Sequence, residues 1–249
     1  MTHVAAAILA SALAASLVFV QPWAGRRRYQ RLLATLATEP DARIRHFRRG
    51  LIGEWAVSGV ILVIGLLAGR TLRSIGLGRG PHPAAEVAIV VEVAIVLAVS
   101  AVVFRFGGSG IRSALRRQAR GFEALLPSGR RERLVFAGLA VTAGICEELI
   151  FRGFAISYLR WLWPAAPRSA IIVITAAAFG LGHLYQGARG VILTGLVGAY
   201  LAWLVLSTGS LLPAMVIHAL LDLRILALPD LRAPAPAPTA GVTPAPSTG

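Results

Sequence analysis

The chain has 249 residues, of which 56% are hydrophobic and only 14% are charged, and its mean hydropathy is +0.71. This composition excludes a soluble globular protein, because apolar runs long enough to cross a bilayer recur along the chain. The formal net charge is +14, all 25 basic residues are arginine, and Arg26–Arg49 and Arg105–Arg133 hold eight arginines each. Basic clusters beside apolar spans follow the positive-inside rule and attract anionic lipid headgroups. We therefore expect contacts with a lipid bilayer and no nucleic-acid partner.

The first predicted span, Val4–Trp23, is an apolar run with no basic segment before it, which favours a retained helix over a signal peptide. Residues Gly25–Gly50 mix arginine with leucine and isoleucine, which predicts an amphipathic helix in the membrane interface. The second and third spans are expected at Leu51–Gly69 and Ala85–Phe104, joined by a loop rich in Gly and Pro. Glu92 lies deep in the third span, where we expect it to line or pair with another group.

Four more apolar runs complete the expected set: Leu134–Phe154, Ser169–Tyr185, Val191–Ser207 and Ser210–Leu228. The arginine-rich connections share one side of the membrane if the N-terminus is outside and the C-terminus is cytoplasmic. The sequence thus predicts an all-α, polytopic transmembrane helix bundle of about seven spans, with a range of six to eight, and interfacial amphipathic helices. Arginine-only basic usage with many alanines and glycines indicates a GC-rich bacterial genome and a cell-membrane location.

The fourth predicted span contains A-G-I-C-E-E-L-I-F-R-G at residues 143–153, with two carboxylates and one guanidinium. A charged side chain at the bilayer centre costs roughly 2.5–3.5 kcal/mol, so these residues require compensation. Glu148 and Arg152 are four residues apart and can pair on one helix face. Glu147 lies about 100° round the helix from Glu148 and has no partner in its own helix. We expect one structural ion pair and one available carboxylate.

Two later spans also carry polar residues at helical spacing. Phe179 and His183 are four residues apart in the fifth span, and His218 and Asp222 are four apart in the seventh. A lone intramembrane histidine is more often a packing residue than a ligand or base, and a lone phenylalanine usually packs in the core. However, polar groups on three helices converge because lipid does not solvate them.

These motifs resemble those of the CPBP (CAAX protease and bacteriocin-processing, also called Abi) intramembrane proteases. The motifs E-E-x-x-x-R, F-x-x-x-H and H-x-x-x-N/D are met in order by Glu147, Glu148, Arg152, Phe179, His183, His218 and Asp222. The resemblance covers about Arg133–Leu228 and implies an intramembrane endopeptidase acting on a peptide or membrane-protein substrate, with these residues as its catalytic site and Phe179 at the substrate.

The resemblance also divides the chain into three parts. Residues 1–132 form N-terminal spans and basic cytoplasmic segments, and residues 133–228 form the CPBP-like catalytic helical core. Residues 229–249 form a Pro/Ala-rich tail that we expect to be disordered. The single cysteine, Cys146, excludes an internal disulfide, and we expect it to be a packing thiol.

Peptide hydrolysis needs an activated water, a polarised carbonyl and a proton for the leaving amine. We hypothesise that Glu147, held in place by its neighbours Glu148 and Arg152, is the general base on water. His183 would orient that water or return the proton. His218 with Asp222 would stabilise the oxyanion.

The eukaryotic CAAX endopeptidases carry asparagine at the last motif position, where this chain has Asp222. A carboxylate accepts hydrogen bonds, whereas an amide also donates them. A donating role in an oxyanion hole is therefore open only to a protonated Asp222.

A metal-dependent mechanism competes with glutamate chemistry, because Glu147, His183 and His218 offer three zinc ligands with an open fourth position. The expected cofactor is thus none or one divalent metal such as zinc. No H-E-x-x-H motif is present, and the sequence favours the metal-free route. The alternatives from other classes are a non-catalytic membrane scaffold or bacteriocin-immunity protein, and a transporter with a proton relay through Glu92, although no internal repeat supports a transporter.

Overall fold

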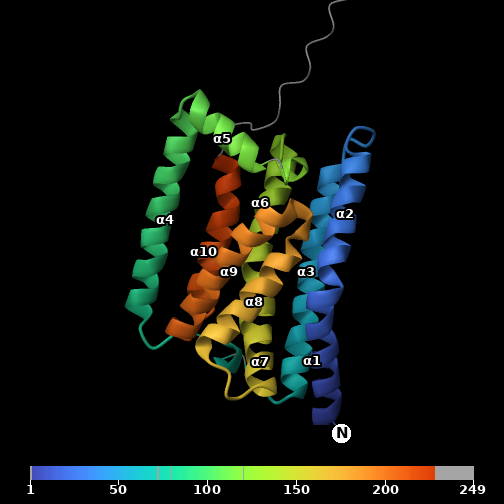
Figure 1. Ribbon diagram of the computed structural model, residues 1–249, viewed down its shortest axis with the longest axis vertical. Coiled ribbons are helices and arrows are strands. Elements are labelled where there is room, and N and C mark those ends of the chain that lie inside the picture. Colours follow the sequence, from blue (N-terminus) through green and yellow to red (C-terminus); the bar gives the residue numbers. More distant parts are fainter. Residues whose placement is uncertain (1, 72, 79, 120, 228–249) are drawn as a thin grey trace, which may run out of the picture.

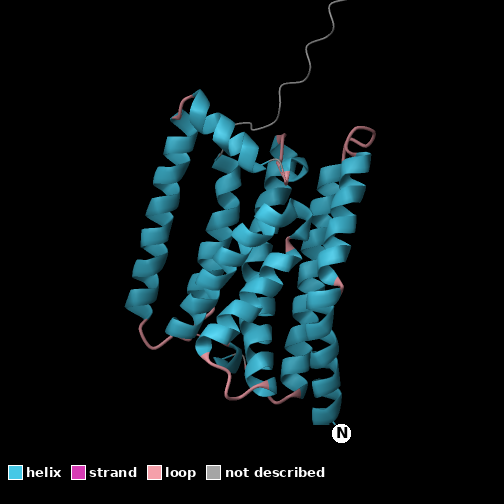
Figure 2. Cartoon of the chain, in the orientation of Figure 1, coloured by secondary structure: helices cyan, strands magenta, loops and turns pink. Residues whose placement is uncertain are grey.

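The computed structural model describes residues 2–71, 73–78, 80–119 and 121–227. Within this part of the chain the secondary structure is entirely helical, and short loops join the helices (Figure 2). The expected all-α class is therefore confirmed. The predicted tail, residues 229–249, lies outside the described residues.

The first two helices, α1 (Thr2–Phe19) and α2 (Gln21–Thr35), form a pair bent by 48°. Pro22 occupies the first turn of α2, where proline is tolerated because the backbone N–H at that position has no helical partner. The third helix, α3 (Ala42–Leu67), then runs back beside the pair (Figure 1).

This arrangement corrects the prediction of a single interfacial helix over Gly25–Gly50. The segment is divided between α2 and the first part of α3, with a turn between them. Tyr29 and Leu32 of α2 are buried in one cluster with Ala42 of α3. The apolar face of the segment is thus covered by other parts of the protein, which removes the need for lipid to cover it.

The next helices are α4 (Pro83–Phe106), α5 (Ser109–Ala119) and α6 (Arg130–Glu148). Helix α4 lies at the outer edge of the bundle next to α10, and many of its large apolar side chains are exposed (Figure 1). Glu92 on this helix is exposed as well, which does not fit the lining or pairing role expected for it.

Helix α6 continues without a break through a π-helical segment, Leu149–Ala155, into α7 (Ile156–Leu162). Together they form a 33-residue apolar helix. The last helices are α8 (Arg168–Gly182), α9 (Gly187–Thr208) and α10 (Leu212–Leu223). Helices α8 and α9 lie side by side in the bundle (Figure 1).

The expected count of about seven spans is not confirmed. Four described helices are long and apolar enough to cross a membrane, or five if α1 and α2 count as one bent span. Helices α8 and α10 have 15 and 12 residues. At 1.5 Å per residue they reach about 22 Å and 18 Å, short of the ~30 Å hydrocarbon core.

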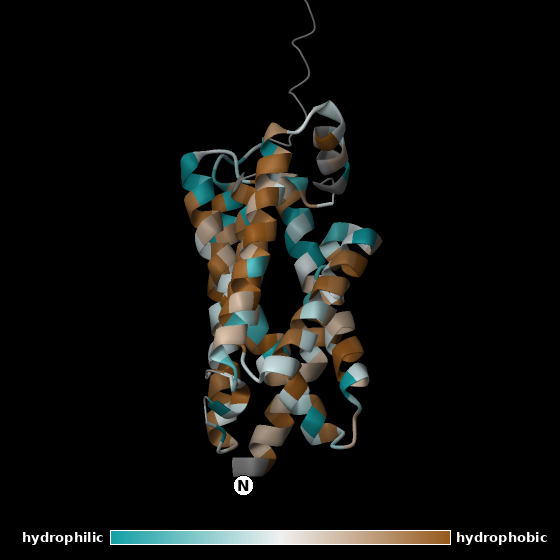
Figure 3. Cartoon of the chain, turned by 90° about the vertical axis from the view of Figure 1, so that its left-hand side faces the viewer, coloured by the Kyte–Doolittle hydropathy of each residue, from teal (hydrophilic) through white to brown (hydrophobic). Residues whose placement is uncertain are grey.

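The main core lies where the α6–π segment meets α9 and α10. Its fully buried members include Leu201 and Leu204 of α9 and Ala214 of α10. Long apolar stretches run along the helices (Figure 3). Large apolar side chains also cover the outside, such as those of Val87, Val96 and Phe106, as a membrane protein requires.

Candidate active site

Helices α6 and α10 come into backbone contact at Gly144. A Cβ atom added there would lie 2.7 Å from both Cβ and N of Ala219, closer than real Cβ atoms approach. Glycine therefore permits this approach, and Glu148 and His218 lie next to the contact point. The close approach brings their side chains within hydrogen-bond distance across the two helices.

Glu148 is the centre of a buried network. Its Oε1 accepts a hydrogen bond from Nη1 of Arg152 at 2.8 Å and lies 2.8 Å from Nδ1 of His218. The side chains of Glu148 and Arg152 are completely buried. The ion pair predicted from the spacing is therefore present, and it satisfies two charges that would otherwise be unpaired in a low-dielectric site. The network also orients the imidazole, a role that the sequence did not assign to Glu148.

Arg152 lies in the π-helical segment that begins directly after Glu148. Its Nη2 donates to the carbonyl oxygen of Gly198 at 3.0 Å, and its guanidinium lies 4.4 Å from the centre of the Phe179 ring. A Cβ atom at Gly198 would lie 2.9 Å from Cδ1 of Phe179 and 3.3 Å from Nη2 of Arg152. Gly198 thus leaves room for both groups, and π-helical segments of this kind are frequent at functional sites.

The Phe179 ring packs between the charged groups of the site. Its centre lies 4.9 Å from that of the His183 ring and 5.7 Å from that of His218, with an edge-on arrangement to the latter. Phe151 packs against it edge-on at 5.2 Å. Because only 2% of Phe179 is exposed, its contacts favour a role in holding the two imidazoles and Arg152.

His183 follows the last residue of α8, where the chain turns through a short 3₁₀ helix, Leu184–Gln186, into α9. Its Nδ1 lies 2.9 Å from the carbonyl oxygen of Phe179. A carbonyl only accepts, so this contact assigns the proton to Nδ1 and leaves a lone pair on Nε2 in the neutral ring. The imidazole also lies within electrostatic range of Asp222.

Glu147 differs from Glu148 in that its side chain is partly exposed. Its side chain is 21% exposed, and its Oε2 is buried, lies 3.9 Å from Nε2 of His218 and makes no hydrogen bond within the described part of the chain. Oδ2 of Asp222 also lies 3.9 Å from the same Nε2. His218 is therefore fixed through Nδ1 and presents Nε2 to two carboxylates.

The structure thus brings most of the predicted residues together around His218 and Phe179. Glu147, Glu148 and Asp222 reach His218 directly, and Arg152 does so through Glu148. His183 joins the group through the shared Phe179 ring rather than through a direct polar contact with His218.

The donor atoms do not form a ready metal centre. No group of three or more His, Cys, Asp or Glu side chains in the described residues is arranged to hold a metal ion. Nδ1 of His218 is bound to Glu148, and Nδ1 of His183 is bound to a backbone carbonyl. The set Glu147, His183 and His218 therefore does not fit a metal in this geometry, and we derive no step through one.

One acidic residue near the site was not singled out by the motifs. Glu54 of α3 lies within electrostatic range of Glu147, Asp222 and His218, and its Oε2 is buried with no hydrogen-bond partner among the described residues. The sequence offered one indication of a role for Glu54, its position within a predicted span, because a carboxylate in a membrane helix needs a compensating interaction. Gly144 and Gly198 were missed too, since a glycine in an apolar helix does not reveal which side chain packs over it.

The comparisons with known proteins agree with the motifs. Residues 130–224 match the family described as type II CAAX prenyl endopeptidase Rce1-like. No curated protein matches the chain, and no solved structure matches it. The matched segment runs from the start of α6 to the end of α10 and contains all seven motif residues. This segment of the chain is therefore similar to the Rce1-like CAAX endopeptidases, the kind of intramembrane protease that its three motifs predicted.

Proposed function

We propose that the protein hydrolyses a peptide bond of a membrane-associated protein or peptide, with Glu147 as the general base on water. The observation that carries this proposal is the difference between two adjacent carboxylates. The Glu148 side chain is fully buried and its Oε1 is bound to Arg152 and His218. The Glu147 side chain is 21% exposed, and its Oε2 has no hydrogen-bond partner in the described residues and lies 3.9 Å from Nε2 of His218. A general base needs a free acceptor within reach of the reacting water.

The proposed reaction begins when Glu147 removes one proton from water as the water oxygen bonds to the carbonyl carbon of the substrate. The carbonyl oxygen becomes an oxyanion, and Nε2 of His218, when protonated, donates to it. The C–N bond then breaks, and the proton taken by Glu147 passes to the leaving amine. His183 supports this transfer through Nε2, the ring nitrogen that its contact with Phe179 leaves free. The products are a carboxylic acid and an amine.

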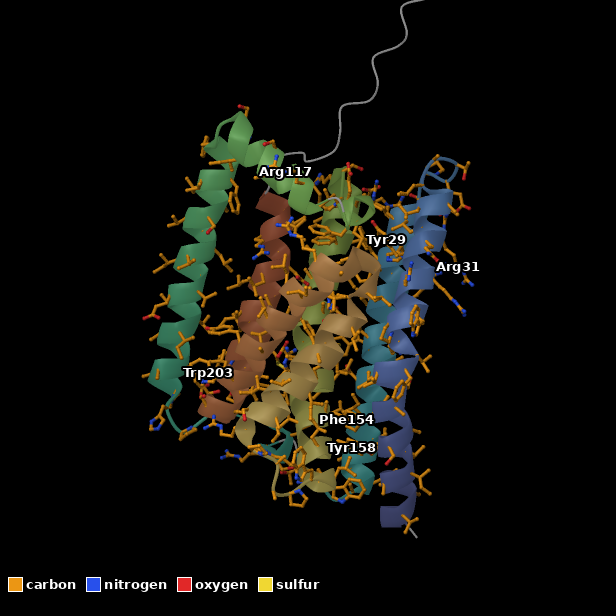
Figure 4. All side chains as sticks on the ribbon, in the orientation of Figure 1. Tyr29, Arg31, Arg117, Phe154, Tyr158 and Trp203 are labelled. Carbon is orange, nitrogen blue, oxygen red and sulfur yellow. The ribbon has the colours of Figure 1, made fainter. Side chains whose placement is uncertain are left out.

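The distribution of arginine supports a proposal for orientation. Arg31 of α2 and Arg117 of α5 lie in the half of the molecule away from the N-terminus, while Phe154 and Tyr158 lie near the N-terminal end (Figure 4). By the positive-inside rule the arginine-rich end faces the cytoplasm and anionic headgroups, and the N-terminus lies outside. We place the protein in a bacterial cell membrane and its substrate, a peptide signal, a bacteriocin leader or a membrane-protein segment, near the cytoplasmic face.

The test compares wild-type protein with Glu147→Gln in proteoliposomes that contain a library of hydrophobic and membrane-anchored peptides. Removal of a general base lowers the rate by about 10²–10⁴-fold, so Glu147→Gln should show almost no cleavage. Glu92→Gln on the exposed face of α4 is the matched control and should cleave like wild type. If wild type and Glu147→Gln process the library alike, or neither cleaves, the scaffold alternative replaces the enzyme.

A further inference from the structure

Glu54 lies on α3, outside the motif-bearing helices. Helix α3 packs along α6 in parallel register: Nε1 of Trp55 donates to Oγ1 of Thr142 at 3.3 Å, and the hydroxyl of Ser58 approaches the thiol of Cys146. This register carries Glu54 to the level of the turn just before Glu147. The packing of α3 against α6 therefore brings a residue of a further helix near the reacting groups.

The electrostatic surroundings of Glu54 are those of the active site. Its carboxylate is within range of Glu147 on α6 and of His218 and Asp222 on α10. Arg28 of α2 is a cation within range of Glu54 besides His218, and Arg152 is within range of Glu147. Each of the two carboxylates thus has a cation near it, which moderates their mutual repulsion.

Four buried oxygen atoms in this region lack a hydrogen-bond partner within the described residues: Oε2 of Glu54, Oγ of Ser58, Oε2 of Glu147 and Oε2 of Glu148. Buried polar atoms are normally hydrogen-bonded, and an exception in a native structure calls for an explanation. Glu148 differs in that its Oε1 is already bound to Arg152 and His218 and its side chain is completely buried. Oε2 of Glu54 and Oε2 of Glu147 come from different helices, and both can accept a hydrogen bond from a small donor.

We propose that Glu54 is a further catalytic residue that binds the attacking water together with Glu147. This role rests on the proposed hydrolysis. Water carries two hydrogens, and Glu147 takes one of them as a proton. Glu54 accepts a hydrogen bond from the other O–H, which stays on the oxygen and becomes part of the product carboxyl group. No proton moves to Glu54, and the two acceptors together aim a lone pair of the water oxygen at the carbonyl carbon.

A purely structural role for Glu54 predicts different behaviour. If Glu54 served only to hold α2 through Arg28, its replacement would reduce the amount of folded protein and leave the turnover of each folded molecule unchanged. If Glu54 holds the water, its replacement by an apolar side chain of similar size removes an unpaired buried carboxylate, which need not destabilise the fold, while turnover falls.

The experiment measures kcat, KM and thermal stability for Glu54→Gln and Glu54→Leu in proteoliposomes. The amide oxygen of Glu54→Gln still accepts a hydrogen bond, so we expect kcat to fall about 10-fold, and about 100-fold in Glu54→Leu, as the water loses its orientation. KM should stay within about twofold in both variants, because the substrate is not touched, and the Tm should not fall. Glu92→Gln, at an exposed position of α4, is the control and should keep the wild-type kcat.

Glu147→Gln in the same assay separates two kinds of failure. If Glu147→Gln abolishes cleavage while Glu54→Leu retains the wild-type kcat, the role of Glu54 is wrong and the proposed function stands. The role is also wrong if activity falls only in proportion to the amount of folded protein. If wild type does not cleave, the proposed hydrolysis fails, and the role of Glu54 falls with it.

Discussion

Nδ1 of His218 and Oε1 of Glu148 lie 2.8 Å apart, across the contact between α6 and α10. The second carboxylate of the E-E pair is thus fully buried and fixes an imidazole, while the side chain of Glu147 is 21% exposed. Two chemically identical neighbours differ because one turns toward Arg152 and the other toward Nε2 of His218.

Arg152→Ala should lower both the folding yield and the activity. The substitution leaves Glu148 as a buried, partly unpaired charge, and breaking a buried ion pair costs about 3–5 kcal/mol. Detergent-solubilised expression yield and the Tm measure the effect. Arg160→Ala, at an exposed position of α7, is the control and should behave like wild type. A normal yield and Tm for Arg152→Ala would contradict the structural role of the pair.

Gly144→Ala should separate α6 from α10. The new methyl group would lie 2.7 Å from the backbone of Ala219, and overpacking of this kind costs about 1–3 kcal/mol. The added distance stretches the Glu148–His218 contact, so the residual activity of folded protein should fall as well as the Tm. Gly138→Ala on the same helix meets only a Leu51 methyl group at 3.9 Å and serves as the control. Equal Tm and activity for the two variants would rule out the close-contact explanation.

Phe179→Ala should destabilise the site more than Phe179→Leu. Truncation of a buried aromatic side chain costs about 3–5 kcal/mol, and here it also removes the ring that contacts both His183 and His218. Leucine fills most of the same volume, but it does not restore the stacking of the ring on the Arg152 guanidinium. Thermal unfolding and kcat should therefore both follow the order wild type, Phe179→Leu, Phe179→Ala. A large change in KM without a change in Tm would point instead to direct substrate contact.

Asp222→Asn should retain activity within about 10-fold of wild type, whereas Asp222→Ala should lose more. The carboxylate lies 3.9 Å from Nε2 of His218, and an amide of the same shape can accept from the imidazole and also donate to an oxyanion. Alanine does neither. Initial rates at saturating peptide measure the difference. Inactive Asp222→Asn with active Asp222→Ala would exclude any hydrogen-bonding role.

Chelator treatment should leave cleavage intact. The potential ligands Glu147, His183 and His218 are not arranged around a common point, and one ring nitrogen of each histidine is already bound. Elemental analysis of the active, purified protein should show far less than one metal ion per chain. Loss of activity with chelator and recovery with zinc would establish the metal-dependent mechanism.

Local spacing was enough to predict the contacts made within one helix. The Glu148–Arg152 pair and the shared face of His218 and Asp222 follow from a separation of four residues, and both appear in the structure. The spacing of residues within one helix does not predict the contacts between helices. Nothing in the spacing of α3 indicates that Glu54 faces Glu147, because the register between two helices depends on how their side chains interlock.

Hydropathy alone also did not show how many of the apolar helices are long enough to cross the membrane. Hydropathy identified the apolar runs in order, but it treated α8 and α10 as full crossings, whereas their helices have 15 and 12 residues. A hydrophobic run also includes the turns and 3₁₀ segments at its ends, such as Leu184–Gln186 after His183. Likewise, amphipathicity in Gly25–Gly50 indicated a face to be covered and gave no indication that a neighbouring helix would cover it.

The π-helical segment Leu149–Ala155 holds more residues per turn than the α-helices on either side of it. Loss of a single residue there would let the ladder close as an ordinary α-helix and would swing α7 by about 100° about its axis relative to α6. A family member lacking that residue would therefore need a differently patterned α7, even with its catalytic carboxylates unchanged.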